Sequence, residues 1–247
     1  GVPKQWRPLG DTRVIDLTIA AFQTHSRVDA VMLVLHPDDM DKAPSGVHVT
    51  EGGADRASSV RRGLKALRAV EPVKVLIHDV ARPCVTAEVI DDVLSALEDA
   101  PGAAPALPVT DALWTGVDGT VTGTRDRTGL YRAQTPQGFH LDAILAAHRA
   151  HDGEAADDVE VARAHGLTVR IVEGVEAERR SLRETHAGGT FVEFEGVDEG
   201  GLYFYFAELF KIERVVDNFL TDGMPDGELI WSRDEGSSDV LMMRVSP

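Results

Sequence analysis

The sequence predicts an α/β protein in which helices cover both faces of a doubly wound, mainly parallel sheet. Short runs such as "AVMLVLH" (residues 30–36) and "VKVLIHD" (residues 73–79) are almost continuously apolar, as expected for strands buried on both faces. Between such runs lie segments whose apolar residues recur with the period of a helix. The two patterns alternate along the first two-thirds of the chain, which favours a parallel sheet.

Each element follows from its local pattern. The clearest helical faces are those of Val14, Leu17, Ala21 and Phe22, and of Ile90, Val93, Leu94 and Leu97. In chain order we expect a helix around residues 14–22, a strand at 30–36, a helix from Val60 to 67 capped by Ser58 or Ser59, a strand at 73–79, a helix around 90–97, a weaker strand at 102–109, a helix around 141–148, a helix from Val159 and a weaker strand at 167–172.

Composition narrows the class of protein. The 247 residues can form one large domain, or one domain with a small appendage. A formal net charge of −16 argues against broad nucleic-acid binding, and no apolar run is long enough to span a membrane. The single cysteine, Cys84, fits a reducing cytoplasm, and we interpret it as a small buried hydrophobe rather than a nucleophile.

The character of the chain changes after about residue 180. Residues 181–247 hold 14 Asp and Glu against 5 Lys and Arg, a net charge of −9, together with most of the phenylalanines. We therefore expect a first domain at 1–180, a boundary near residues 180–190 with "AGG" (residues 187–189) as the hinge, and a small acidic α+β segment at 181–247. Within that segment, "GLYFYFAELFKIERVVDNFL" resembles a strand that runs into a helix.

Two short segments follow apolar runs, where ligands bind in parallel sheets. In "GGADRASSV", Gly52, Gly53 and Arg56 precede a helix start whose backbone N–H groups suit a phosphate or a base edge; the alternative is an ordinary capped loop. In "HDVARP", Asp79 leaves a buried strand and is placed to hold Mg²⁺ against nucleotide phosphates, with Arg82 nearby; the alternative is a structural ion pair.

Two later segments are also dense in polar side chains. "DRTGLYRAQTPQGF" contains Arg127, which could bind a phosphate bidentately, and Thr135; the alternative is a solvated hairpin tip. In "EAADDVEV", Asp157 or Asp158 could cap the helix from Val159. The histidines show no metal-ligand spacing, so we interpret them as surface or packing residues.

Together, "PKQWRPLG", "GGADRASSV", "HDVARP", "PVTD", "DRTGLYRAQTPQGF" and the "DD" pair resemble the 2-C-methyl-D-erythritol 4-phosphate cytidylyltransferase family over about residues 1–180. The resemblance implies a nucleotide-binding sheet with a protruding β-arm near residues 108–130 that builds a homodimer. It also implies cytidylyl transfer from CTP to a polyol phosphate, with Mg²⁺, in non-mevalonate isoprenoid biosynthesis. No nucleic-acid or membrane partner is implied.

By position, the resemblance assigns roles to individual residues. Lys4 would stabilise the triphosphate in the transition state, and Asp79 would bind the metal. Arg127, reaching across from the partner's arm, and Thr135 would contact the substrate phosphate. The remaining implied contacts are Gly52, Gly53, Arg56, Ser59, Asp79, Ala81 and Arg82 for the nucleotide, and Asp157 and Asp158 for the substrate polyol.

The sequence also departs from the family pattern. The family's first strand and its Gly-rich phosphate loop would stand before "GVPKQ", so we expect a central strand to be absent and sheet edges to be exposed. Arg180 falls where the family has a catalytic lysine, Glu176 and Glu178 flank the position of a second carboxylate, and Ala112 replaces a common threonine.

Three hypotheses of function therefore remain open. The chain could be a cytidylyltransferase, with a pentitol phosphate as the alternative acceptor. It could be a non-catalytic, truncated or fused relative that keeps the fold and the dimer arm. The acidic segment could instead be a binding module that uses the first part as a scaffold.

Overall fold

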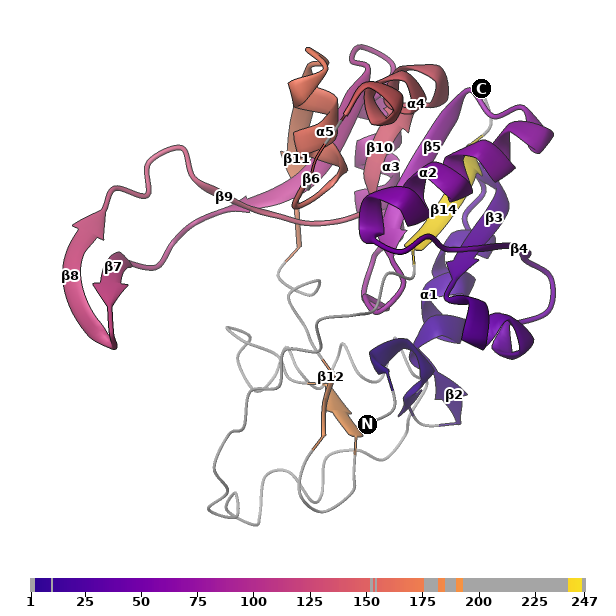
Figure 1. Ribbon diagram of the computed structural model, residues 1–247, viewed down its shortest axis with the longest axis horizontal. Coiled ribbons are helices and arrows are strands. Elements are labelled where there is room, and N and C mark those ends of the chain that lie inside the picture. Colours follow the sequence, from indigo (N-terminus) through magenta and orange to yellow (C-terminus); the bar gives the residue numbers. More distant parts are fainter. Residues whose placement is uncertain are drawn as a thin grey trace.

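The computed structural model describes residues 3–9, 11–151, 153, 155–175, 182–184, 190–192 and 240–245. At its centre lies a sheet with the strand order β11-β6-β10-β5-β14-β3-β4, with β9 paired to β6 (Figure 1). Along this order only β10 and β14 run against the other strands, so the predicted mainly parallel sheet is confirmed. The strands are β3 (Val28–Leu35), β4 (His48–Glu51), β5 (Lys74–Asp79), β6 (Gly102–Pro108), β9 (Tyr131–Ala133), β10 (Gln137–His140), β11 (Val169–Glu173) and β14 (Val240–Val245).

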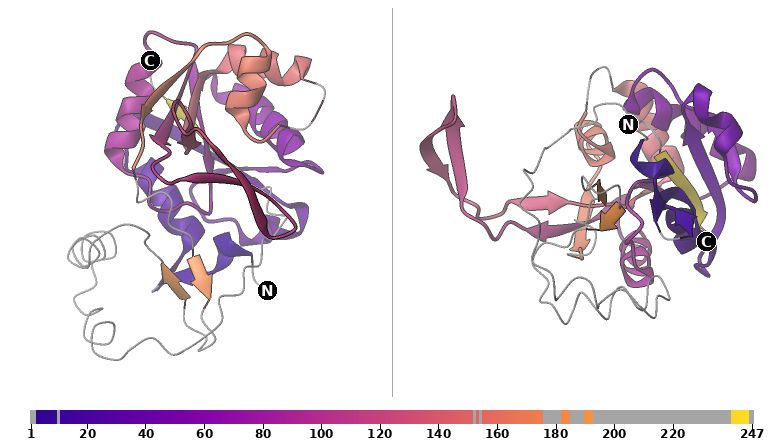
Figure 2. Two further views of the ribbon diagram at one scale, coloured as in Figure 1. Left: turned by 90° about the vertical axis from the view of Figure 1, so that its left-hand side faces the viewer. Right: turned by 90° about the horizontal axis from the view of Figure 1, so that it is seen from below.

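Helices cover both faces of the sheet (Figure 2). They are α1 (Val14–Gln23), α2 (Arg56–Leu67), α3 (Ala87–Ala96), α4 (Leu141–Ala150) and α5 (Asp158–Ala164). Leu33 of β3 packs in a core with α1 and α3, whereas its neighbours Met32 and Val34 pack in a second core with α2, α4 and α5. Because alternate residues of a strand point to opposite faces, a strand between two helical layers is apolar throughout.

The helices and strands predicted within the described residues are present, and the start of α2 needs a correction. The helix begins at Arg56, four residues before Val60, and its cap is Asp55 rather than Ser58 or Ser59. The Asp55 carboxylate accepts from the backbone N–H of Ser58 at 2.6 Å, and the Ser58 hydroxyl accepts from the backbone N–H of Asp55 at 3.1 Å. This reciprocal pair is a capping box, in which the serine is the third helical residue.

The predicted β-arm is confirmed. The hairpin of β7 (Leu113–Val117) and β8 (Thr120–Arg125) projects away from the sheet (Figures 1 and 2). Its turn is Asp118–Gly119, and both residues have positive φ, at 48° and 74°. An Asp-Gly pair favours this two-residue hairpin turn, so the sequence itself carried a signal for the tip of the arm.

The segment 126–140 contains strand β10 where the sequence predicted a polar loop. Gly138 explains why a strand fits there: a Cβ atom at this position would lie 2.6 Å from Cγ1 of Val93 and 3.0 Å from Cδ1 of Leu97. Helix α3 therefore packs directly against the backbone of β10, which pairs antiparallel with β5 and β6.

The C-terminal strand β14 lies in the middle of the sheet, in yellow in Figure 1. It runs antiparallel to both neighbours, with Val240 beside Asp79 and Val34, and Val245 beside Lys74 and Val28. The expectation of exposed edges at the centre of the sheet is therefore wrong, because β14 pairs with β3 and β5 along all six of its residues.

Smaller elements complete the described part of the chain. They are η1 (Lys4–Trp6), η2 (Pro37–Lys42), η3 (Arg68–Val70), β1 (Pro8–Leu9), β2 (Thr12–Arg13), β12 (Leu182–Glu184) and β13 (Thr190–Val192). None of the helices in the described ranges is long and apolar enough to cross a membrane. The hinge at 187–189 and the predicted strand and helix around 201–220 lie outside the described residues. The boundary near residue 180 stays a prediction, although residues 240–245 return to the sheet of the first part.

Candidate functional site

The carboxyl ends of β3, β4 and β5 bring together several of the predicted site residues. Asp79 is the last residue of β5, and its side chain is 47% exposed. Its Oδ1 accepts from the backbone N–H of Ala81 at 3.0 Å, and its Oδ2 lies 3.3 Å from Nε of Arg82. The ion pair that the sequence offered as an alternative is thus present, while the carboxylate keeps a face toward solvent.

A buried histidine connects this turn to Thr135. Nε2 of His78 lies 3.0 Å from the carbonyl oxygen of Arg82, and Nδ1 lies 2.9 Å from Oγ1 of Thr135. Burial lowers the pKa of His78 to about 4, so the ring is neutral at neutral pH. Because a carbonyl oxygen can only accept, Nε2 carries the single ring proton. Nδ1 therefore accepts the hydroxyl proton of Thr135, which fixes the orientation of that hydroxyl group.

Hydrogen bonds to β3 and to helix α2 hold the glycine loop after β4 in place. The backbone N–H of Gly52 donates to the carbonyl of Leu35 at 2.7 Å, and that of Gly53 donates to Oγ of Ser59 at 2.9 Å. The Ser59 hydroxyl donates in turn to the carbonyl of Asp55 at 2.9 Å, and Ser59 is fully buried. A Cβ atom on Gly53 would lie 2.1 Å from Oγ of Ser58, so only glycine fits here. Ser59 thus shapes the loop, and the predicted contacts of this loop with a nucleotide stay predictions.

Arg56 lies at the start of α2, beside this loop, and forms an ion pair with a buried carboxylate. Its Nη2 lies 2.6 Å from Oδ2 of Asp158, which is completely buried at the start of α5. Oδ1 of the same carboxylate lies 2.9 Å from Nε2 of His148, also buried, on α4. Burial raises the pKa of Asp158, but the bonds from His148 and Arg56 outweigh it and hold the pKa below its usual range.

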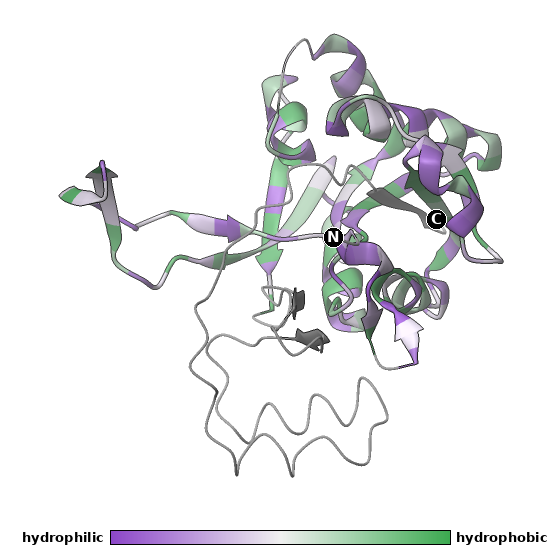
Figure 3. Ribbon diagram, turned by 60° about the horizontal axis from the view of Figure 1, so that its bottom comes forward, coloured by the Kyte–Doolittle hydropathy of each residue, from purple (hydrophilic) through white to green (hydrophobic). Residues whose placement is uncertain are grey.

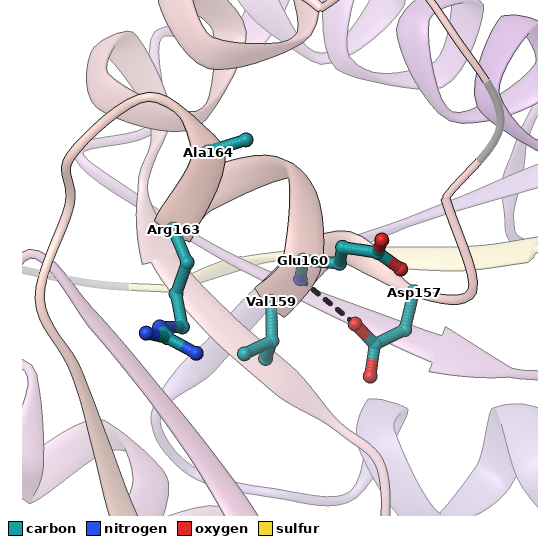
Figure 4. A pocket seen from close by; sticks show the side chains of 5 residues that line it. All are labelled: Asp157, Val159, Glu160, Arg163 and Ala164. Carbon is teal, nitrogen blue, oxygen red and sulfur yellow. Dashed lines mark hydrogen bonds between the residues drawn. The ribbon is translucent and has the colours of Figure 1, made fainter.

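Asp157 has a different role from its neighbour. It caps α5, since its carboxylate accepts from the backbone N–H of Glu160 at 2.9 Å, as one reading of the sequence predicted (Figure 4). Its other oxygen accepts from Nε2 of Gln137 at 2.9 Å, and Oε1 of Gln137 accepts from the backbone N–H groups of Asp158 and Val159. Gln137 therefore fastens the start of α5 to β10.

Figure 4 shows a surface pocket along α5. It is lined by Asp157, Val159, Glu160, Arg163 and Ala164. Asp157 is the one predicted site residue among these five, so the pocket is separate from the residues gathered around Asp79. We assign no ligand to it.

Lys4 belongs to a short N-terminal turn that packs beside α1. Within this turn Trp6 is buried, its indole N–H donates to Asp39 at 3.0 Å, and the guanidinium of Arg13 lies 5.3 Å from the ring centroid. Helix α1 is in turn joined to the Asp79 turn, since the Thr18 hydroxyl donates to the carbonyl of Val80 at 2.8 Å. The fold thus attaches the segment that carries Lys4, through α1, to the carboxyl end of β5.

Arg127 lies apart from the other predicted site residues of the same chain. It is exposed at the base of the arm, where Nη1 donates to the carbonyl of Thr110. Figure 1 shows the arm extending away from the sheet. A contact between Arg127 and the region around Asp79 would therefore have to come from a second copy of the chain, as the resemblance implied.

The candidate metal ligand is a single carboxylate. Among the described residues, no three His, Cys, Asp or Glu side chains gather into a group that could hold a metal ion. Asp79 is partly exposed, and Mg²⁺ is commonly bound through one or two carboxylates with the remaining oxygens supplied by substrate phosphates and water. The residues present therefore suit a magnesium–nucleotide complex better than a metal ion held by the protein alone.

The pH dependence of stability tests the ion pair of Asp158. The pKa of this group is lower in the folded than in the unfolded protein, so its stabilisation is complete above the unfolded pKa and is lost as the pH falls toward the folded value. Between pH 5 and pH 2.5 we expect the wild type to lose more free energy of unfolding than Asp158→Asn, as measured by urea denaturation. Parallel curves for the two proteins would show that Asp158 has an ordinary pKa.

Sequence reasoning missed His78, His148 and Gln137. From the sequence we interpret both histidines as surface or packing residues; the structure shows that both are buried and that each is hydrogen-bonded to a residue predicted to bind substrate. Their signal in the sequence was weak. His78 occupies an otherwise apolar strand and His148 an otherwise apolar helix face, and a polar residue in such a place needs a buried partner.

Comparison with known proteins places these observations in a family. The family model described as 2-C-methyl-D-erythritol 4-phosphate cytidylyltransferase matches residues 1–184. A protein of that name from Cereibacter sphaeroides is 55% identical over 194 residues, which cover 76% of this chain and 85% of the relative. A bifunctional enzyme IspD/IspF from Ruegeria pomeroyi is 61% identical over 178 residues, 70% of this chain, and the chain spans 47% of that relative. The crystal structure of the cytidylyltransferase from Thermus thermophilus superposes with a TM-score of 0.63 at 33% identity, covering 72% of this chain and 87% of the other.

Proposed function

The chain belongs to the 2-C-methyl-D-erythritol 4-phosphate cytidylyltransferase family, and on this premise we propose that it transfers a cytidylyl group from CTP to 2-C-methyl-D-erythritol 4-phosphate. The observation that carries the proposal is that predicted site residues lie at one edge of the sheet, where the parallel strands β3, β4 and β5 end. The Gly52–Arg56 loop follows β4, the turn from Asp79 to Arg82 follows β5, and Thr135 is hydrogen-bonded to His78 of β5. This edge is where such sheets bind nucleotides.

The proposed reaction requires positioning and charge neutralisation more than covalent chemistry by the protein. A phosphate oxygen of the acceptor attacks the α-phosphorus of CTP, the bond from that phosphorus to the β-phosphate oxygen breaks, and pyrophosphate leaves. Lys4 and Arg82 supply positive charge on the phosphate side. Thr135, whose hydroxyl proton is committed to His78, offers its oxygen lone pairs to a donor on the acceptor.

We also propose Mg²⁺ as the metal that accompanies CTP. Asp79 would hold it, together with phosphate oxygens of the nucleotide and water. Bound there, the ion would neutralise part of the charge on the triphosphate. The ion pair with Arg82 orders the turn that carries Asp79.

Competition between acceptors tests the substrate. The full chain, CTP and MgCl₂ are mixed with equal concentrations of methylerythritol 4-phosphate and ribitol 5-phosphate, and the two nucleotide products are separated by chromatography. We expect the methylerythritol product to dominate, in line with the names of the closely similar proteins. A dominant CDP-ribitol product would favour the pentitol-phosphate alternative. No product from either acceptor would contradict the proposed function.

We further propose that the active form is a homodimer joined through the arm. Figure 3 colours parts of the arm green, as hydrophobic. Three hydrophobic side chains of the arm would be left in water in a monomer: Trp114 is 69% exposed, Val117 61% and Val121 55%. Such a patch is typical of a protein interface. In this arrangement Arg127 of one copy contacts the acceptor bound to the other.

A cytoplasmic location, with no nucleic-acid or membrane partner, agrees with the single cysteine and the net charge of −16.

Substitution in the arm tests the dimer. Trp114→Glu places a charge in the proposed interface, so we expect sedimentation equilibrium to show a monomer where the wild type is a dimer. We expect kcat/KM for the acceptor to fall about tenfold or more, since the charge-assisted bonds of Arg127 would be lost. Ile171→Glu, which changes an apolar residue on β11 that is 56% exposed, serves as the control. A monomeric wild type with full activity would contradict this arrangement.

A further inference from the structure

Hydrogen bonds join His148, Asp158 and Arg56 into a polar network that links three helices. His148 lies on α4, Asp158 is the first residue of α5 and Arg56 is the first residue of α2. The outer member, Arg56, has a side chain that is 37% exposed beside the Gly52–Gly53 loop, whereas Asp158 and His148 are 0% and 1% exposed. This polar network therefore extends from the core to the edge of the proposed nucleotide site.

A completely buried carboxylate is costly unless its oxygens are paired. In this structure one oxygen of Asp158 is bound to Arg56 at 2.6 Å and the other to His148 at 2.9 Å. The backbone N–H of Asp158 is also bound, to Oε1 of Gln137 at 3.0 Å. With no exposed surface and both oxygens occupied, the carboxylate is not available to a substrate in this arrangement.

The geometry differs from the role that the resemblance implied for Asp158, a direct contact with the substrate polyol. A guanidinium group has five N–H donors, and a carboxylate that binds one end of it limits the directions in which the others can point. His148 holds the carboxylate from the opposite side, so the anion cannot turn to follow Arg56. The buried residues Asp158 and His148 thus hold the exposed side chain of Arg56 in a fixed orientation.

We propose that Asp158 and His148 are positioning residues that orient Arg56 toward the bound nucleotide. The inference rests on the proposed function, because Arg56 is assigned to the nucleotide side of that same site. It predicts an effect on the affinity for CTP in the ground state. The rate of cytidylyl transfer from the saturated complex should change little, because the resemblance assigns Arg56 to the cytosine and ribose side of the nucleotide rather than to the reacting phosphorus.

Steady-state kinetics of Asp158→Asn test the proposal. We expect the KM for CTP to rise about tenfold, the loss expected when a charge-assisted hydrogen bond is weakened, while kcat stays within about twofold of the wild type. Glu160→Gln is the matched control, since it neutralises an exposed carboxylate on the same helix and should leave both constants unchanged. A merely structural role for Asp158 would instead lower kcat with the folded fraction and leave KM unchanged, which would overturn the proposal.

A double-variant cycle shows whether Asp158 acts through Arg56. Arg56→Gln should raise the KM for CTP at least as much as Asp158→Asn, and adding the second change to the first should produce no further rise. Increases that multiply in the double variant would show that Asp158 acts independently of Arg56 and would overturn the proposal.

A second pair of variants is used if Asp158→Asn does not fold. His148→Phe removes the hydrogen-bond donor to Oδ1 of Asp158, whereas His148→Gln keeps a donor at this position. The proposal requires a higher KM in the first than in the second.

The cycle also separates this inference from the proposed function. A wild-type chain that transfers cytidylyl groups, combined with an unchanged KM in Asp158→Asn, would overturn the positioning role alone. A wild-type chain that neither binds CTP nor releases pyrophosphate would overturn both.

Discussion

Replacement of Lys4 by methionine is expected to lower kcat for cytidylyl transfer by a factor of about 10²–10³, the usual cost of losing one group that stabilises developing charge in a transition state. Methionine keeps most of the length of the side chain and removes the ammonium group, with its charge and its hydrogen-bond donors. The short turn of Lys4–Trp6 is held by buried Trp6 and its bond to Asp39, so the fold should be retained. Pyrophosphate release, measured at saturating concentrations of both substrates, gives the change in kcat.

The control for this experiment is Lys65→Met, which removes an exposed charge from α2 at a distance from the proposed site. The kcat of Lys65→Met should equal that of the wild type. If Lys4→Met also keeps the kcat of the wild type, then Lys4 has no part in the transition state, and the role implied by the resemblance is wrong.

Proline at position 242 is expected to destabilise the whole sheet. In a strand with partners on both sides, each backbone N–H donates to one neighbour or the other, so proline removes a ladder hydrogen bond wherever it stands in β14. We expect Met242→Pro to lower the free energy of unfolding by about 3 kcal/mol or more, a large fraction of the stability of an ordinary domain. Urea denaturation followed by circular dichroism provides the measurement.

Met242→Leu keeps the backbone N–H and a similar side-chain volume, so it should change the free energy of unfolding by less than about 1.5 kcal/mol. The comparison isolates the backbone contribution of β14. A proline variant as stable as the leucine variant would show that β14 does not lie between β3 and β5 in solution.

The sequence predicted the α/β architecture well, because buried parallel strands and amphipathic helices leave strong local patterns. The run at residues 30–36 is apolar throughout since its residues alternate between two helical layers, and it forms β3 as expected. The position of β14 could not be predicted in this way. Pairing between residues 240–245 and strands more than 150 positions away is a long-range property that no local pattern records.

The candidate site was predicted in outline but not in its internal connections. Asp79 and Arg82 form the ion pair that the sequence offered as one alternative, and Asp157 caps the helix that follows it. The sequence could not show that Asp158, its immediate neighbour, is turned into the core. Asp157 is the extended N-cap residue and Asp158 the first residue of the helix, and only the packing of α5 against α4 and the sheet decides which of these two adjacent carboxylates is buried.

The formation of CDP-methylerythritol tests the central claim most directly. The full chain is incubated with CTP, methylerythritol 4-phosphate and MgCl₂, and ³¹P NMR follows the phosphorus signals of substrate and product. We expect a new diphosphate signal and one pyrophosphate for each nucleotide product, with neither formed at a comparable rate by Lys4→Met. Unchanged CTP and acceptor signals, at a protein concentration that a single turnover would reveal, would contradict this claim.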